Sequence, residues 1–134
     1  MDMTALVSQL LFTLQLLTGY QVSAPEVQQK SRAEIGAIVC PTSKCAPYSA
    51  YREGVVYLSH DVDRSIPKGR STLYHELVHH AQERGTHKGQ PHVASGDACS
   101  ESVAREHEAY AAQNQYLSEI ENSGLRAYYN GRCW

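Results

Sequence analysis

The sequence lacks both an excess of positive charge and a long apolar run. Twelve Lys and Arg stand against fourteen Asp and Glu, so the 134-residue chain has a net charge of −2 at pH 7 and no basic excess of the kind that nucleic-acid binding requires. No apolar stretch reaches the roughly 18–20 residues that cross a bilayer. We therefore predict a single domain, residues 1–134, that binds no nucleic acid and does not insert into a membrane.

The N-terminal segment lacks the positive charge of a signal peptide. Asp2 stands where a basic region is required, and the first Lys or Arg is Lys30, although residues 22–24 resemble a cleavage site. Leucines recur instead at the spacing of one helix face: Leu6, Leu10, Leu14 and Leu17. We predict a core-packing helix over residues 4–18, in a chain from which any export signal is already missing.

Histidine and cysteine are plentiful for so short a chain, with seven and four residues. An even cysteine count in a small domain predicts two disulfides. Cys40 and Cys45 bracket a turn-forming stretch and are expected to pair with each other, which leaves Cys99 to pair with Cys133. Four reduced thiols in a cytosolic protein are the alternative. The paired arrangement predicts an extracellular or periplasmic protein.

The first half of the chain predicts two strands. The polar residues 25–31 predict a short helical turn, and residues 34–40 read as a buried strand. A turn over residues 40–47 would join this strand, in the manner of a hairpin, to a second strand at residues 55–58. Together with the helices that follow, these strands predict an α+β fold with a small antiparallel or mixed sheet.

The second half predicts two helices. Ser71 is a good N-cap for a helix over residues 72–84, which Gly85 ends. Asp97 or Ser100 caps a longer helix that runs to about Glu121. We expect the chemistry-bearing residues of the chain to lie on these two helices.

His75 and His79 enclose the pattern H-E-x-x-H on the first of these helices. Four residues are slightly more than one turn, so both imidazoles project from one face and can chelate one zinc ion. Glu76 cannot join them as a ligand, but it lies where it can take a proton from zinc-bound water. The alternative is a solvated helix face that carries two histidines by accident. We predict a catalytic site with Zn²⁺ as its cofactor.

A catalytic zinc site needs a third protein ligand and one open position. Glu101, Glu106 and Glu108 compete for this role on the downstream helix. At about 100° per residue, Glu106 falls near the centre of the apolar arc, whereas the other two lie on the polar side. Burying a carboxylate there is costly unless a cation compensates its charge. We predict Glu106 as the third ligand and keep Glu108 as the alternative.

The sequence His75-Glu76-x-x-His79, followed by Glu106-x-Glu108-Ala109, resembles the gluzincin superfamily of zinc peptidases. The second motif is similar to the E-x-E-A-D pattern of membrane-bound prenyl-protein peptidases, whose first Glu binds zinc, which again implies Glu106. Tyr110 replaces the Asp of that pattern. Another group must therefore orient a zinc-bound histidine.

Residues 51–58, 75–82 and 106–110 also resemble a family of small, poorly characterised bacterial zincin-like proteins. The resemblance covers about residues 40–117 and implies a minimal zincin-like fold with an active-site helix and a Glu-bearing helix. The N-terminal helix predicted from the leucine spacing would pack against it. The resemblance also implies that the strand before the active-site helix forms the sheet edge over the cleft. Val55, Val56 and Tyr57 would then pair with an extended substrate. A half-buried strand without that role is the alternative.

These patterns predict a zinc metallopeptidase of the gluzincin type that acts on a peptide or protein substrate. His75, His79 and Glu106 would hold the metal, and Glu76 would be the general base. Two alternatives stay open: a zincin-like domain that binds zinc without turnover, and a zinc amidohydrolase or toxin that acts on cell-wall peptides.

The neutral donor that stabilises the oxyanion is not fixed by the sequence. Its candidates are Tyr110, His107, His92 and Tyr51. We predict that the remaining histidines lie on the surface: His60, His80 and His87.

Overall fold

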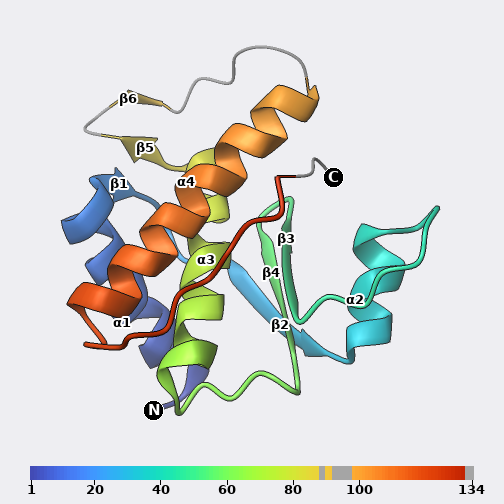
Figure 1. Cartoon of the computed structure of the whole chain (residues 1–134), viewed down its shortest axis with the longest axis horizontal. Coiled ribbons are helices and arrows are strands. Elements are labelled where there is room, and N and C mark those ends of the chain that lie inside the picture. The colour runs from blue at the N-terminus through green and yellow to red at the C-terminus, as the bar shows by residue number, and fades with distance from the viewer. Residues whose placement is uncertain (88–89, 92–97, 132–134) are drawn as a thin grey trace.

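A long helix in the middle of the chain lies between a second long helix and a three-stranded sheet (Figure 1). The computed structural model describes residues 1–87, 90–91 and 98–131. The elements are, in order, α1 (Met3–Thr18), β1 (Tyr20–Gln21), β2 (Glu26–Lys30), α2 (Arg32–Val39), β3 (Ser49–Arg52), β4 (Val55–Ser59), α3 (Pro67–Arg84), β5 (Thr86–His87), β6 (Gln90–Pro91) and α4 (Ala98–Glu119). This confirms the predicted α+β class.

Helix α1 is the predicted N-terminal packing helix. Asp2 caps it, because its side chain accepts a hydrogen bond from the Ala5 amide at 2.8 Å. Its leucine face is buried in a core shared with β4, α3 and α4. Gly19 ends the helix with a positive φ of 83°, a conformation that glycine adopts without strain.

Residues 34–40 were expected as a strand, and that expectation is wrong because α2 occupies this segment. Ser31 and Glu34 form a capping box: the Ser31 hydroxyl accepts from the Glu34 amide at 3.1 Å, and the Glu34 carboxylate accepts from the Ser31 amide at 3.0 Å. This S-x-x-E pair nucleates a helix. A short apolar run alone does not distinguish a strand from a buried helix.

The expected turn at residues 25–31 is also wrong, since β2 pairs there with β4. The sheet has the order β2-β4-β3, with β2 parallel and β3 antiparallel to β4. Strands β3 and β4 form the hairpin. Its two-residue turn places Glu53 and Gly54 at φ values of 48° and 83°, as a tight hairpin turn requires.

Strand β4 therefore lies in the centre of the sheet. The expectation that Val55, Val56 and Tyr57 form the sheet edge is wrong, because β4 pairs on both sides. The parallel partner β2 was not expected, because its segment is polar and was interpreted as a turn. The free edge beside α3 belongs to β3.

Helix α3 begins earlier than expected, at Pro67, with Ile66 as its N-cap. Ser71 was expected as the cap. It lies within the helix, where its hydroxyl donates to the Lys68 carbonyl at 2.8 Å. Gly69 permits the close approach of the preceding loop, since a Cβ there would lie 1.7 Å from the Asp63 carbonyl oxygen. The part of α3 that carries the H-E-x-x-H pattern is mostly buried.

The predicted local disulfide, Cys40–Cys45, is confirmed. It ties the end of α2 to the segment that leads into β3, and it indicates a protein located outside the reducing cytoplasm. Cys133 lies outside the described residues, and so does the expected Cys99–Cys133 bridge. In the described part of the chain, none of the helices combines the length and apolar character needed to cross a bilayer.

Candidate metal centre

Three side chains from α3 and α4 converge on one point. The Nε2 atoms of His75 and His79 are 3.2 Å apart, and His75 Nε2 is 3.3 Å from Glu106 Oε1. His79 Nε2 contacts the same carboxylate oxygen. Two ligands that are each about 2.0–2.1 Å from a tetrahedral zinc ion lie about 3.3 Å apart. The His75–His79 and His75–Glu106 distances therefore match the spacing of neighbouring ligands of one ion, whereas His79 and Glu106 approach each other more closely.

The orientation of His75 is fixed by a chain of hydrogen bonds behind it. Ser71 Oγ uses its hydrogen on the Lys68 carbonyl, so it accepts from Gln113 Nε2 at 3.2 Å. Gln113 Oε1 then faces His75 Nδ1 at 2.9 Å. Because this oxygen only accepts, Nδ1 carries the proton. The lone pair of His75 is therefore on Nε2, which faces Glu106.

Gln82 orients His79 in the same way. Its Nε2 donates to the Arg105 carbonyl at 2.9 Å and to Glu108 Oε1 at 2.8 Å, and both partners are pure acceptors. Gln82 Oε1 is therefore left for His79 Nδ1, at 2.8 Å. The lone pair of His79 also lies on Nε2, so the two rings present lone pairs to the same point.

Two imidazole nitrogens and a carboxylate gather here in a buried space and could hold a metal ion. The side chains of His75 and Glu106 are 8% and 9% exposed, so water compensates little of the charge. Burial opposes the charged forms, but the close approach of the carboxylate to the two imidazoles outweighs it, so the pKa of Glu106 is lowered and that of His79 is raised. Nitrogen and carboxylate ligands of this number and spacing suit Zn²⁺.

The alternative ligand Glu108 lies outside this cluster. Its Oε1 accepts hydrogen bonds from Tyr20 Oη and from Gln82 Nε2, each at 2.8 Å. Glu101 faces Arg105 instead, at 3.8 Å. Only Glu106 of the three glutamates joins the metal-binding group found among the described residues.

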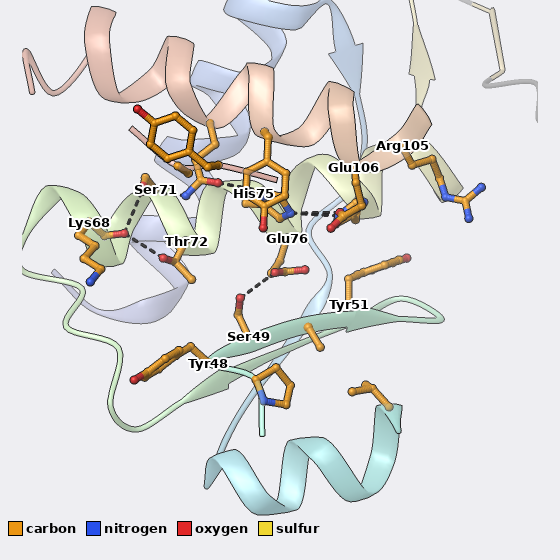
Figure 2. Close-up of a pocket in the computed structure, with 18 of the residues that line it drawn as sticks. Tyr48, Ser49, Tyr51, Lys68, Ser71, Thr72, His75, Glu76, Arg105 and Glu106 are labelled. Atoms are coloured by element: carbon orange, nitrogen blue, oxygen red, sulfur yellow. Dashed lines mark hydrogen bonds and ion pairs between the residues drawn. The ribbon is translucent and has the colours of Figure 1, made fainter. Parts of the chain in front are cut away.

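Glu76 lies beside the cluster and points toward the sheet. Its Oε2 accepts a hydrogen bond from Ser49 Oγ on β3 at 2.7 Å (Figure 2). No other described group forms a hydrogen bond with this carboxylate, and the residue lines the cavity described next. Its Oε1 is therefore available to a molecule in that cavity.

A cavity of about 980 Å³ opens between β3, α3, α4 and the C-terminal segment, residues 122–131. Glu76 and the three candidate ligands all line it. Lys68 and Arg105 lie toward its opposite ends (Figure 2). Most of its apolar lining comes from the end of α2, the segment that leads into β3, the last turns of α4 and the C-terminal segment: Val39, Pro41, Pro47, Tyr48, Leu117, Leu125 and Tyr128.

The candidates for an oxyanion donor are placed differently. The ring of Tyr110 lies edge-on to that of His75, with centroids 4.4 Å apart, and lines the cavity. Burial and the charges of Glu106 and Glu76 raise its pKa. The Tyr51 hydroxyl is engaged by Glu83 at 2.7 Å.

The other two candidates do not reach the cavity in the described structure. His107 packs on Tyr129, with centroids 5.2 Å apart, and is not part of the cavity lining. His92 lies outside the described residues.

His80 is buried, which corrects its expected place on the surface. Its Nε2 donates to the Ser23 carbonyl at 2.8 Å, and its Nδ1 lies 3.0 Å from Tyr51 Oη. Burial lowers its pKa. His80 is buried because α3 is covered on both faces. His87 is partly buried against the Thr18 carbonyl, and His60 is exposed as expected.

Three polar residues that shape the site were not found from the sequence. Gln113 was detectable, because it follows Glu106 by two helical turns and places a second polar group in the same apolar arc. Gln82 follows His79 by three residues and so shares its side of the helix. Nothing in the sequence distinguishes Ser49, because its role depends on the approach of β3 to α3.

Comparisons with known proteins give no match: no protein-family model fits the chain, and neither a curated protein nor a solved structure matches it. The resemblance to gluzincins therefore rests on the motif residues.

Proposed function

We propose that the chain is a zinc-dependent peptidase with Glu76 as its general base. The observation that carries the proposal is the convergence of two locked imidazole lone pairs and a buried carboxylate, next to a second carboxylate, in an accessible cavity. His75, His79 and Glu106 would hold the ion. This donor set leaves a coordination position for a reacting molecule, as catalytic zinc sites do.

In this proposal Glu76 would move the proton. A bound zinc ion supplies Lewis acidity, which lowers the pKa of a water molecule to about 7 and counters negative charge on an oxygen. Glu76 accepts the proton from that water and later delivers it to the leaving nitrogen. Ser49 holds one oxygen of the carboxylate at 2.7 Å, so the other oxygen keeps a fixed direction while it accepts and releases the proton.

The free edge of β3 would position an extended substrate. The Ser59 amide donates to the Tyr48 carbonyl at 2.8 Å, and main-chain groups alternate in direction along an antiparallel strand. Ala50 and Arg52 therefore face β4, whereas the main-chain groups of Ser49 and Tyr51 face outward. A peptide that pairs with them would run beside Glu76 and the metal ligands.

The disulfide supports a location outside the cytoplasm for this activity. Cys40 and Cys45 join the two segments that carry Pro41 and Pro47, which line the cavity. We propose that the protein acts in the periplasm or outside the cell, where such a bond persists.

The first test is metal content. Purified protein should contain about one zinc per chain by elemental analysis, and His79→Ala should lose most of it. His60→Ala is the matched control, because His60 is exposed and lies outside the cluster. Wild-type protein that takes up no zinc would refute the proposal.

The second test is turnover. The zinc-loaded protein should cleave an unstructured protein chain, and Glu76→Gln should abolish cleavage while retaining zinc. Zinc binding without cleavage of proteins or of cell-wall peptides would identify a binding domain. Cleavage of cell-wall peptides alone would identify an amidohydrolase.

A further inference from the structure

We infer that the Tyr110 hydroxyl is the oxyanion donor of this site: it donates a hydrogen bond to the carbonyl oxygen of the scissile bond as that oxygen becomes negative. This inference rests on the proposed peptidase function. It assigns a catalytic role that the sequence left open among four residues.

The position of Tyr110 on α4 places it beside the reacting atoms. It follows Glu106 by four residues, so the two side chains share one face of the helix. Its ring packs edge-on against the His75 ring at a centroid distance of 4.4 Å. It lines the same cavity as Glu76. The ring is therefore next to a proposed metal ligand and on the side that a substrate would occupy.

The Tyr110 hydroxyl is available for a ligand. None of the described residues forms a hydrogen bond with it. The Tyr51 hydroxyl, in contrast, already donates to Glu83 at 2.7 Å and accepts from the Gly54 amide at 2.9 Å. Of the two tyrosine candidates, Tyr110 alone has a donor free to meet a developing charge.

The C-terminal segment holds the Tyr110 ring in place. Tyr129 stacks on it with centroids 5.6 Å apart and an interplanar angle of 22°. Asn114 secures this segment along α4 (Figure 1), since its side chain exchanges two hydrogen bonds, of 2.9 and 2.7 Å, with the main chain of Ala127. A donor clamped between His75 and Tyr129 needs no rearrangement when charge develops.

In the chemical step, Tyr110 donates a hydrogen bond and transfers no proton. The water oxygen bonds to the carbonyl carbon while Glu76 takes its proton, and the electron pair of the C=O double bond moves to the carbonyl oxygen. Tyr110 donates a hydrogen bond to that oxygen and keeps its proton. When the C–N bond breaks, the nitrogen leaves with the proton that Glu76 carried.

The test compares Tyr110→Phe with Tyr57→Phe in the zinc-loaded full-length chain. Tyr57 lies on β4 and is not part of the cavity lining. Its variant therefore removes a tyrosine hydroxyl that lies outside the proposed site. We expect Tyr110→Phe to lower kcat by about 10²–10³-fold, with KM and zinc content unchanged. Tyr57→Phe should behave as wild type.

A binding measurement gives a readout independent of turnover. A phosphonamidate peptide carries a tetrahedral, negatively charged centre in place of the scissile carbonyl. Tyr110→Phe should weaken its binding by about 10–100-fold, whereas Tyr57→Phe should not. Unchanged phosphonamidate affinity in a Tyr110→Phe variant that retains zinc overturns the inference and leaves the metal site standing. Wild-type protein without zinc refutes the proposed function itself, and this inference with it.

Tyr129 is a positioning residue in this scheme. Tyr129→Leu removes the stacked ring and should lower kcat several-fold without changing KM or zinc content, and Tyr129→Phe should restore most of the loss. Equal kcat values for wild type and Tyr129→Leu would show that the segment plays no part in holding Tyr110.

Discussion

On the helical side of the cavity, formed by α3 and α4, the polar side chains that face the candidate metal position are held by further side chains. Each histidine ligand has its own glutamine, and each glutamine is oriented by acceptors behind it. On the strand side, β3 offers outward-facing main-chain groups and mostly apolar neighbours. If the chain is the proposed peptidase, the helical side would fix the chemistry, whereas the strand side would hold a chain of varied sequence.

Among the described residues, one hydrogen bond between side chains joins Glu76, the proposed general base, to the strand side. It runs from Ser49 on β3 to Glu76 on α3, at 2.7 Å. If the two sides divide the work as proposed, changes on the helical side should affect metal affinity and kcat. Changes at the strand side should act mainly through KM or through this one contact.

The largest expected effect comes from removing the carboxylate ligand. Glu106→Ala should weaken zinc binding by more than about 100-fold, the upper limit for residues that act through a ligand. Glu108→Ala should cost at most about 10–100-fold, because Glu108 acts through Gln82. Zinc affinities from competition with a chelator measure both. Full occupancy in Glu106→Ala with loss in Glu108→Ala would reverse the assignment of the ligand.

The next largest loss of zinc affinity is expected from removing the glutamines that orient the histidines. Gln113→Ala releases Nδ1 of His75 and should weaken zinc binding by about 10–100-fold. Gln115→Ala is the matched control, since Gln115 lies on the same helix and has no described polar partner. Equal chelator-competition curves for the two variants would show that the orientation of His75 does not depend on Gln113.

The contact between Ser49 and Glu76 should matter less. Ser49→Ala leaves Glu76 in place but frees its carboxylate to rotate, and a hydrogen bond to a charged group is worth about 1.5–3 kcal/mol at most. We expect kcat to fall by about 3–10-fold with zinc content unchanged. A change confined to KM in steady-state kinetics would mean that Ser49 serves the substrate and not the base.

The smallest expected effect concerns the stability of the helical side. Arg70 on α3 donates two hydrogen bonds to Glu121, at 2.6 and 2.8 Å, and this lowers the pKa of Glu121. Its stabilising contribution is therefore fully present above the unfolded-state pKa of about 4.3 and is lost as the pH falls through the lower folded-state value.

Glu121→Gln is the matched variant for this pair. Urea unfolding should show it less stable than wild type by about 1–2 kcal/mol at pH 7, with the difference shrinking below about pH 4. A difference that stays constant from pH 7 to pH 3 would contradict the assignment of the pair.

The helical side was far easier to predict from the sequence than the strand side. His75 and His79 are separated by one helical turn, and Glu106 interrupts an apolar arc, so local periodicity alone places them. The spacing of these site residues follows the period of the helix that carries them, so the site can be predicted without knowledge of the fold.

The strand side depends on contacts between distant segments. Residues 55–57 were expected at the edge of the sheet, but they lie in its centre. The reason is that β2, which was expected to be a turn, pairs with β4 on the side opposite β3, so β3 forms the edge. Residues 34–39 were misread although Ser31 and Glu34 carried the helix signal. Ser49 reaches Glu76 only because the hairpin packs against α3, and no local pattern encodes that approach.

The central claim is that one divalent ion is held by His75, His79 and Glu106. An anomalous difference map, from a crystal grown with one equivalent of zinc and measured at the zinc absorption edge, tests it most directly. The account predicts a single strong peak about 2.0–2.2 Å from both Nε2 atoms and from the Glu106 carboxylate. A map without that peak, or with the zinc bound elsewhere on the chain, would contradict it.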